Sequence, residues 1–123
     1  LFQCRVFSVP IDIAQFRSRA SGSVAGATQR HAEYVQTLGI PLATAADICP
    51  ISQRLVVCTY GPAYLLESDD KGWSERRMMR IKLPNRRQGE AIAFAGTDTL
   101  LATSEFAPTP LWTIPIPQYT TEK

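Results

Sequence analysis

Two copies of one strand–turn–strand unit occur in this sequence, and the repeat constrains the fold more than any other feature. The first copy covers residues 45–60 (AADICP, a turn, LVVCTY), and the second covers residues 88–105 (QGEAIAF, a turn, TLLATSE). Each copy places an apolar strand on either side of a short turn. A repeat of this kind indicates supersecondary units that bury their apolar faces against one another.

The spacing of the repeat and the strand content of each unit predict a β-propeller. Ile48 and Ile92 are 44 positions apart, and Leu55 and Leu100 are 45 apart, so this alignment places one extra residue in the second turn. A period of about 40–45 residues with four short strands is the signature of a propeller blade. We therefore expect an all-β fold, a partial β-propeller of about two four-stranded antiparallel blades.

Strands are expected wherever apolar and β-branched residues alternate or run together. By this criterion they fall at 5–11, 33–40, 44–50, 55–60, 63–67, 75–83, 89–95, 99–105 and 111–116.

These strands divide the chain into blade-like segments. Residues 5–43 are expected to supply the outer strands of one blade, interrupted by an insert at 12–32 whose Ser, Gly and Ala content predicts a flexible loop. Residues 44–84 form a complete blade, residues 88–117 an incomplete last blade, and residues 118–123 a polar tail. Two blades do not close a ring. We therefore expect the remaining blades to come from the same parent chain or from another chain.

Composition bounds the class of protein. With 123 residues, 45% hydrophobic and 20% charged, the chain is expected to be one globular unit. No run approaches the roughly 18 consecutive apolar residues of a membrane span. The net charge of +2 does not by itself indicate nucleic acid. The chain begins at Leu1 without a readable signal peptide, which we interpret as a segment or processed product of something longer.

The three cysteines, Cys4, Cys49 and Cys58, leave at least one thiol unpaired. If residues 51–54 form the hairpin loop, Asp47 faces Cys58, and the last two cysteines are not opposed. We therefore expect no bridge between them and interpret the cysteines as small buried apolar residues.

Acidic residues mark the start of the first strand in both copies. In a propeller the first strand of each blade lines the central channel, so Asp47, Gln88 and Glu90 are the channel-facing candidates for ligand binding. Asp47 and Glu90, from adjacent blades, could share a calcium ion, which takes about 6–8 oxygen ligands. The alternative is that they accept hydrogen bonds from backbone amides. Tyr60 and Glu105 end the second strands and are expected at a rim, with Tyr60 packed and Glu105 solvated.

One run of positive charge falls on the expected outermost strand of a blade. Its members are Arg76, Arg77, Arg80, Lys82, Arg86 and Arg87. A nucleic acid or another anionic partner is one interpretation. A solvated edge, on which charge discourages pairing with other strands, is the interpretation we prefer, because no aromatic residues are interleaved with the run.

The ordered motifs resemble the C-terminal blades of bacterial β-propeller proteins of the phytase-like or esterase-like group. The strings that carry the resemblance are GIPLATAADICP, RLVVCTYGPAYLLE, IKLP, QGEAIAF, LLATSE and PLWTIP. The chain departs from that pattern at the turns 50–53 and 95–98, where the group has a PDG turn. The resemblance implies a propeller fold and a secreted or periplasmic parent protein, but it transfers no activity.

Three functions are therefore open. The first is a non-catalytic scaffold that binds a ligand or a protein, because no GxSxG, HExxH or P-loop motif occurs and no catalytic residue is assigned. The second is a fragment of a calcium-dependent, phytase-like phosphoester hydrolase that uses Asp47 and Glu90. The third and weakest is nucleic-acid binding through the arginine-rich strand.

Overall fold

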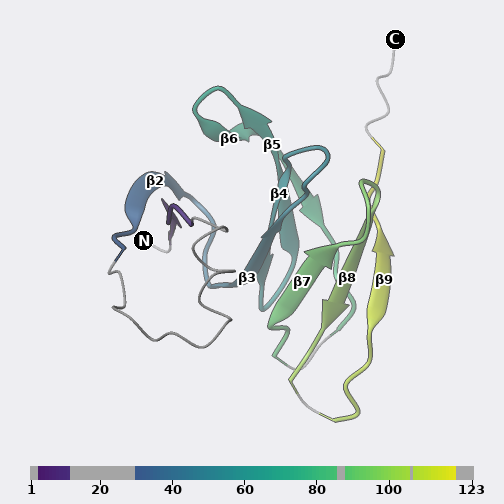
Figure 1. The fold of residues 1–123 in the computed structure, drawn as a ribbon. Coiled ribbons are helices and arrows are strands. Elements are labelled where there is room, and N and C mark those ends of the chain that lie inside the picture. The colour runs from purple at the N-terminus through teal and green to yellow at the C-terminus, as the bar shows by residue number, and fades with distance from the viewer. Residues whose placement is uncertain (1–2, 12–29, 86–87, 106, 119–123) are drawn as a thin grey trace, which may run out of the picture. The chain divides into compact units, whose positions relative to one another are not determined.

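The computed structural model describes residues 3–11, 30–85, 88–105 and 107–118. Every regular element in these ranges is a β-strand, which confirms the all-β class (Figure 1). Most of the predicted insert, residues 12–29, lies outside the described residues. So do Arg86, Arg87 and the tail from residue 119 onward.

The nine strands agree closely with those expected from the sequence. In chain order they are β1 (Cys4–Ser8), β2 (Glu33–Leu38), β3 (Ala43–Ile48), β4 (Leu55–Thr59), β5 (Ala63–Asp69), β6 (Gly72–Ile81), β7 (Ala91–Phe94), β8 (Thr99–Thr103) and β9 (Trp112–Pro115).

Each sheet consists of strands that follow one another in the chain. The orders are β1-β2, β3-β4-β5-β6 and β7-β8-β9. The four-stranded and three-stranded sheets correspond to the segments predicted at 44–84 and 88–117. Short turns join all of these strands except β8 and β9, which a longer connection at 104–111 joins, and short turns favour antiparallel neighbours.

The chain divides into two compact units. Arg5–Thr37 forms one by itself, and Leu38–Lys123 with the first four residues forms the other. In the smaller unit, the rings of Phe7 and Tyr34 meet edge to face, with centroids 5.9 Å apart and an interplanar angle of 73°. This T-shaped geometry is the one that aromatic quadrupoles favour.

In the larger unit, one hydrophobic core joins the four-stranded and three-stranded sheets. Its buried members come from both sheets and are Val56, Cys58, Ala63, Leu65, Ile81, Leu83, Ile92, Leu100, Ala102, Ile114 and Ile116. All five residues of β4 are buried, including those on the face that does not join this cluster. The uninterrupted apolar run of β4 is therefore explained by burial on both faces.

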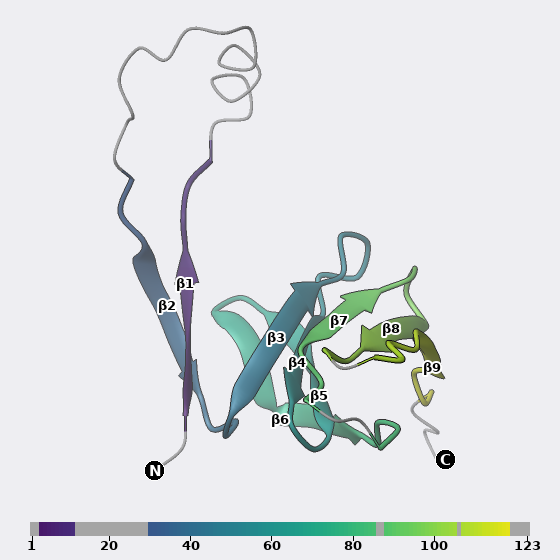
Figure 2. The ribbon, with the colours of Figure 1, turned by 90° about the horizontal axis from the view of Figure 1, so that it is seen from below.

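The first strands of these two sheets, β3 and β7, lie side by side and run in the same direction (Figure 2). The Thr44 hydroxyl donates a hydrogen bond to the Gly89 carbonyl oxygen at 2.7 Å. Further along, the Phe94 amide donates to Asp47 Oδ2 at 2.7 Å. Residue numbers rise together on the two strands, so the strands are parallel although they belong to different sheets. We call this pairing the β3–β7 contact.

The turns that follow β3 and β7 also meet. Arg54 Nη2 donates to the Thr97 carbonyl oxygen, and Cys49 Sγ lies 3.6 Å from the Gly96 carbonyl oxygen. Gly96 has a φ of 80°, a left-handed conformation that glycine adopts without steric cost. These bonds continue the β3–β7 contact beyond the ends of the strands.

The hairpin between β3 and β4 begins one residue earlier than expected. The Cys49 amide donates to the Arg54 carbonyl oxygen at 2.9 Å, so the loop comprises residues 50–53. Cys58 therefore lies opposite Ala45, and Asp47 lies opposite Val56. The predicted pairing of Asp47 with Cys58 was wrong because the loop closes around Cys49.

All three cysteines are free, in agreement with the expected lack of a bridge. Cys49 and Cys58 are fully buried, whereas Cys4 is only partly buried. A hydrogen bond from Ser52 lowers the pKa of the Cys49 thiol, and the nearby Arg54 charge adds to the effect.

The strand register also corrects the alignment of the repeat. Ile48 pairs with Leu55 in the first copy, and Phe94 pairs with Leu100 in the second. The first strands are thus related by a spacing of 46 rather than 44, while the second strands keep a spacing of 45. The extra residue belongs to the first turn, not the second.

This correction separates the two acidic candidates. At a spacing of 46, Asp47 corresponds to Ala93 and Glu90 corresponds to Thr44. On its own strand, Asp47 therefore lies three residues after the position that corresponds to Glu90. The alignment at a spacing of 44 places Asp47 only one residue later than Glu90, and the observed register increases this offset to three.

We predict that Asp47→Ala lowers the free energy of unfolding by about 1–3 kcal/mol, because the part-buried Phe94 amide loses its acceptor. Urea denaturation measures the change. Asp69→Ala is the matched control, since the Asp69 carboxylate also accepts a backbone amide, that of Lys71, but within a single exposed turn. A midpoint for Asp47→Ala equal to that of the wild type would show that the β3–β7 contact is not stabilising.

Candidate functional site

Polar side chains gather at the end of the two larger sheets where β3 and β7 begin. We call it the leading end. Because neighbouring strands are antiparallel, β4, β6 and β8 finish there. Two features occupy it: an acidic pair beside the start of β7, and an open pocket beside the end of β6.

Gln88 sets the geometry at the start of β7. It is exposed and has a φ of 48°, a left-handed conformation that is uncommon outside glycine. Its carbonyl oxygen accepts a hydrogen bond from the Glu105 amide at 3.2 Å. This bond holds the segment after β8 against the segment before β7, so that Glu105 lies close to Glu90.

Glu90 and Glu105 form the acidic pair. Partial removal from water raises the pKa of the Glu90 carboxyl, and a hydrogen bond with Glu105 and repulsion from its charge raise that pKa further. Two neighbouring carboxyl groups resist ionising together and favour a shared proton. Both residues are candidates from the sequence, but their contact carries no local sequence signal.

Asp47 lies away from this pair. It contacts Phe94 at the far end of β7, four residues beyond Glu90, which corresponds to about 13 Å along a strand. Its two carboxylate oxygens accept hydrogen bonds from the amides of Ile48, at 2.9 Å, and Phe94, at 2.7 Å. This arrangement matches the alternative interpretation of the sequence, in which the carboxylate accepts hydrogen bonds from backbone amides. Asp47 and Glu90 do not fit a shared calcium ion.

No cluster of three or more His, Cys, Asp or Glu side chains within the described residues has the geometry to hold a metal ion. In the same part of the chain, no helix is long and apolar enough to cross a membrane.

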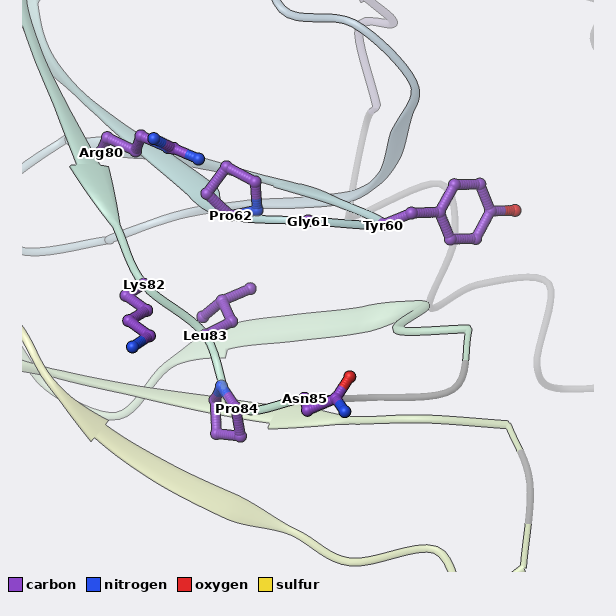
Figure 3. A pocket seen from close by; sticks show the side chains of 8 residues that line it. All are labelled: Tyr60, Gly61, Pro62, Arg80, Lys82, Leu83, Pro84 and Asn85. Atoms are coloured by element: carbon purple, nitrogen blue, oxygen red, sulfur yellow. The ribbon is translucent and has the colours of Figure 1, made fainter.

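Tyr60 directly follows β4 and Glu105 lies two residues after the end of β8, so both lie at the leading end just beyond the strands that they were expected to end. Glu105 is exposed, in agreement with the prediction. Tyr60 is 52% exposed rather than packed, because the chain turns immediately after it and carries the ring away from the core. Tyr60 lines the pocket at its margin, with the ring directed outward (Figure 3).

The pocket has a volume of about 600 Å³ and opens to solvent. Its lining residues come from two short connections and the end of β6: Tyr60, Gly61, Pro62, Arg80, Lys82, Leu83, Pro84 and Asn85 (Figure 3). The turn between β4 and β5 makes one wall, and the segment that follows β6 makes the other. Arg80 extends along the first wall beside Pro62.

Sequence reasoning found the charges of this pocket but not the pocket. Arg80 and Lys82 belong to the run of positive charge expected on an outermost strand, and both are exposed. Nothing in the sequence brings the Gly61-Pro62 turn opposite residues 83–85. That arrangement depends on β5 and β6 pairing between Ala63 and Ile81.

The described members of the arginine-rich run lie on β6 or, in the case of Lys82, directly after it. β6 is the edge strand of the four-stranded sheet, and Arg76, Arg77 and Arg80 are exposed on it. Charge on an edge strand opposes pairing with another strand. Among the described members of the run, which are Arg76, Arg77, Arg80 and Lys82, the last two also line the pocket.

Comparisons with known proteins were made at three levels. No protein-family model matches the sequence, and no curated protein or solved structure matches the chain.

We predict that the acidic pair makes folding less favourable as the pH rises from acid to neutral. Because the pKa of Glu90 is raised in the folded state, the folded protein holds this proton more tightly than the unfolded chain. The stabilisation is present below the ordinary carboxyl pKa and is lost as the pH passes through the raised value. Glu90→Gln should remove this loss, so the variant should melt at a higher temperature than the wild type at neutral pH.

Thermal unfolding from acid to neutral pH measures the difference. Glu67→Gln on β5 is the control and should leave the pH profile of Tm unchanged. A wild-type profile that runs parallel to that of Glu90→Gln would contradict a shared proton in the pair.

Proposed function

We propose that this chain is a segment of a β-propeller and acts as a non-catalytic scaffold that binds a ligand or a protein partner. The observation that carries the proposal is the β3–β7 contact. In a propeller, the first strands of successive blades surround a common axis and run in the same direction. A parallel pair of first strands from consecutive antiparallel sheets is the arrangement that such a ring requires.

The outer surfaces of the three-stranded sheet support the same proposal. One face of β8 contributes Leu100 and Ala102 to the core, whereas the other face exposes part of Leu101. On β7, the exposed residues Ala91 and Ala93 are small. Because these alanine side chains are short, another sheet can approach this part of the face closely.

The edge strand β9 is a further argument for a propeller. β9 pairs with β8 on one side, and within the described residues no strand pairs with its other side. The preceding sheet has four strands. A fourth strand beside β9 would complete a second blade of the same size, and the ordered motifs that resemble bacterial propellers of the phytase-like or esterase-like group are consistent with this.

A scaffold is favoured over the calcium-dependent hydrolase because of how the acidic residues are used. The Asp47 carboxylate caps two backbone amides, and Glu90 is paired with Glu105 rather than with Asp47. The exposed groups at the leading end are instead a tyrosine ring, an amide and two cations around an open pocket. These groups can recognise a ligand through hydrogen bonds and charge.

The architecture is tested by electron cryo-microscopy of the complete protein. We expect a ring of sheets in which β3 and β7 line the axis, with a fourth strand beside β9. Closure of the two larger sheets into a two-layer sandwich, with no further sheet against Ala91 and Ala93, would overturn the propeller.

The absence of catalysis is tested with chromogenic phosphate and acetate esters. The wild type and Glu90→Gln should both hydrolyse them no faster than buffer, with and without added calcium. Calcium-dependent phosphoester hydrolysis that disappears in Glu90→Gln would replace the scaffold with the hydrolase.

A further inference from the structure

The pocket at the leading end has the size and rigidity of a ligand site. Its volume of about 600 Å³ falls within the roughly 300–1,000 Å³ of small-molecule sites. The Thr59 hydroxyl fixes one wall, because it donates to the Pro62 carbonyl oxygen at 2.7 Å and accepts from the Gly61 amide at 3.0 Å. The other wall is anchored by the buried side chain of Leu83. The pocket is therefore formed before a ligand arrives.

The charge of the pocket is one-sided. Arg80, near the end of β6, and Lys82, which directly follows β6, are the two cations among the described lining residues, and none of these residues is acidic. Neither cation forms an ion pair with another described residue. The Asn85 amide and the Tyr60 hydroxyl add neutral hydrogen-bonding groups. Within the described part of the chain, no lining residue offsets the charge of these two cations.

The rest of the lining is apolar or aromatic. Pro62 and Pro84 present rigid rings on opposite walls, and Tyr60 presents its ring at the margin (Figure 3). Such surfaces contact a hydrocarbon or aromatic body without a large loss of side-chain freedom. The pocket thus combines an anion-binding end with apolar walls.

We propose that this pocket binds a small organic anion, a carboxylate or phosphate ester carried on an apolar body, with Arg80 and Lys82 contacting the anionic group. The proposal deepens the binding role argued above and rests on it. It does not depend on the number of blades, because every lining residue belongs to the four-stranded sheet and its connections.

Amide NMR titrations of the purified protein test the proposal. Phenyl phosphate and benzoate carry the two kinds of anionic group on the same ring, and benzamide is their neutral counterpart. At least one anion should shift the Gly61 and Asn85 amide signals, with a Kd at least tenfold below that of benzamide. Binding of phenyl phosphate alone identifies a phosphate site, and binding of benzoate alone identifies a carboxylate site.

Variants of the two pocket cations show whether these side chains bind the anion. Arg80→Gln and Lys82→Gln should each weaken anion binding roughly tenfold, the effect of losing one charge-assisted hydrogen bond. Arg76→Gln is the matched control, because Arg76 is exposed on the same strand but does not line the pocket. It should leave the affinity unchanged.

Three results would overturn the proposal. They are equal affinity for benzamide, equal weakening by Arg76→Gln, and no shift of the pocket amides by either anion. A single-stranded oligonucleotide that binds more tightly than phenyl phosphate and is weakened by all three variants would assign the strand to nucleic acid instead. If the chain is a hydrolase rather than a scaffold, the ester assays detect hydrolysis. Anion binding alone produces no hydrolysis, so the two proposals can fail independently.

Discussion

The carboxylate of Asp47 is the contact on which the arrangement of the two larger sheets depends. Apolar burial pulls these sheets together, but it is non-directional and would tolerate many relative offsets. The bond from the Phe94 amide to Asp47, together with that from Thr44 to Gly89, selects one offset along β3 and β7. The parallel course of the first strands and the position of the leading end both follow from that choice.

Much of the fold could be predicted from the sequence, because its cause is local. The apolar runs and their Gly-, Pro- and Asp-containing turns defined nine strands, and short connections made sequential antiparallel sheets the expected topology. The alignment of the copies was wrong by two residues on the first strand. Matching Ile48 to Ile92 ignored hydrogen bonding, whereas the register matches Ile48 to Phe94. Similar side chains do not define which backbone positions pair.

The candidate site was less predictable because it is assembled from distant segments. Glu90 and Glu105 were both selected, yet their meeting depends on a backbone bond from Glu105 to Gln88. Tyr60 was expected to pack, but the turn that follows it directs the ring outward. The pocket between residues 60–62 and 83–85 carries no local sequence signal, since its walls are joined only through the pairing of β5 with β6.

The two outer strands of the larger unit differ in what they present. β6 carries exposed arginines, whereas β9 has the sequence Trp-Thr-Ile-Pro and bears no charge at all. Charge therefore opposes the addition of a strand beside β6, whereas β9 carries no charge that would oppose addition there. Charge at the edges of the larger unit thus favours β9 over β6 as the place where a further strand would add.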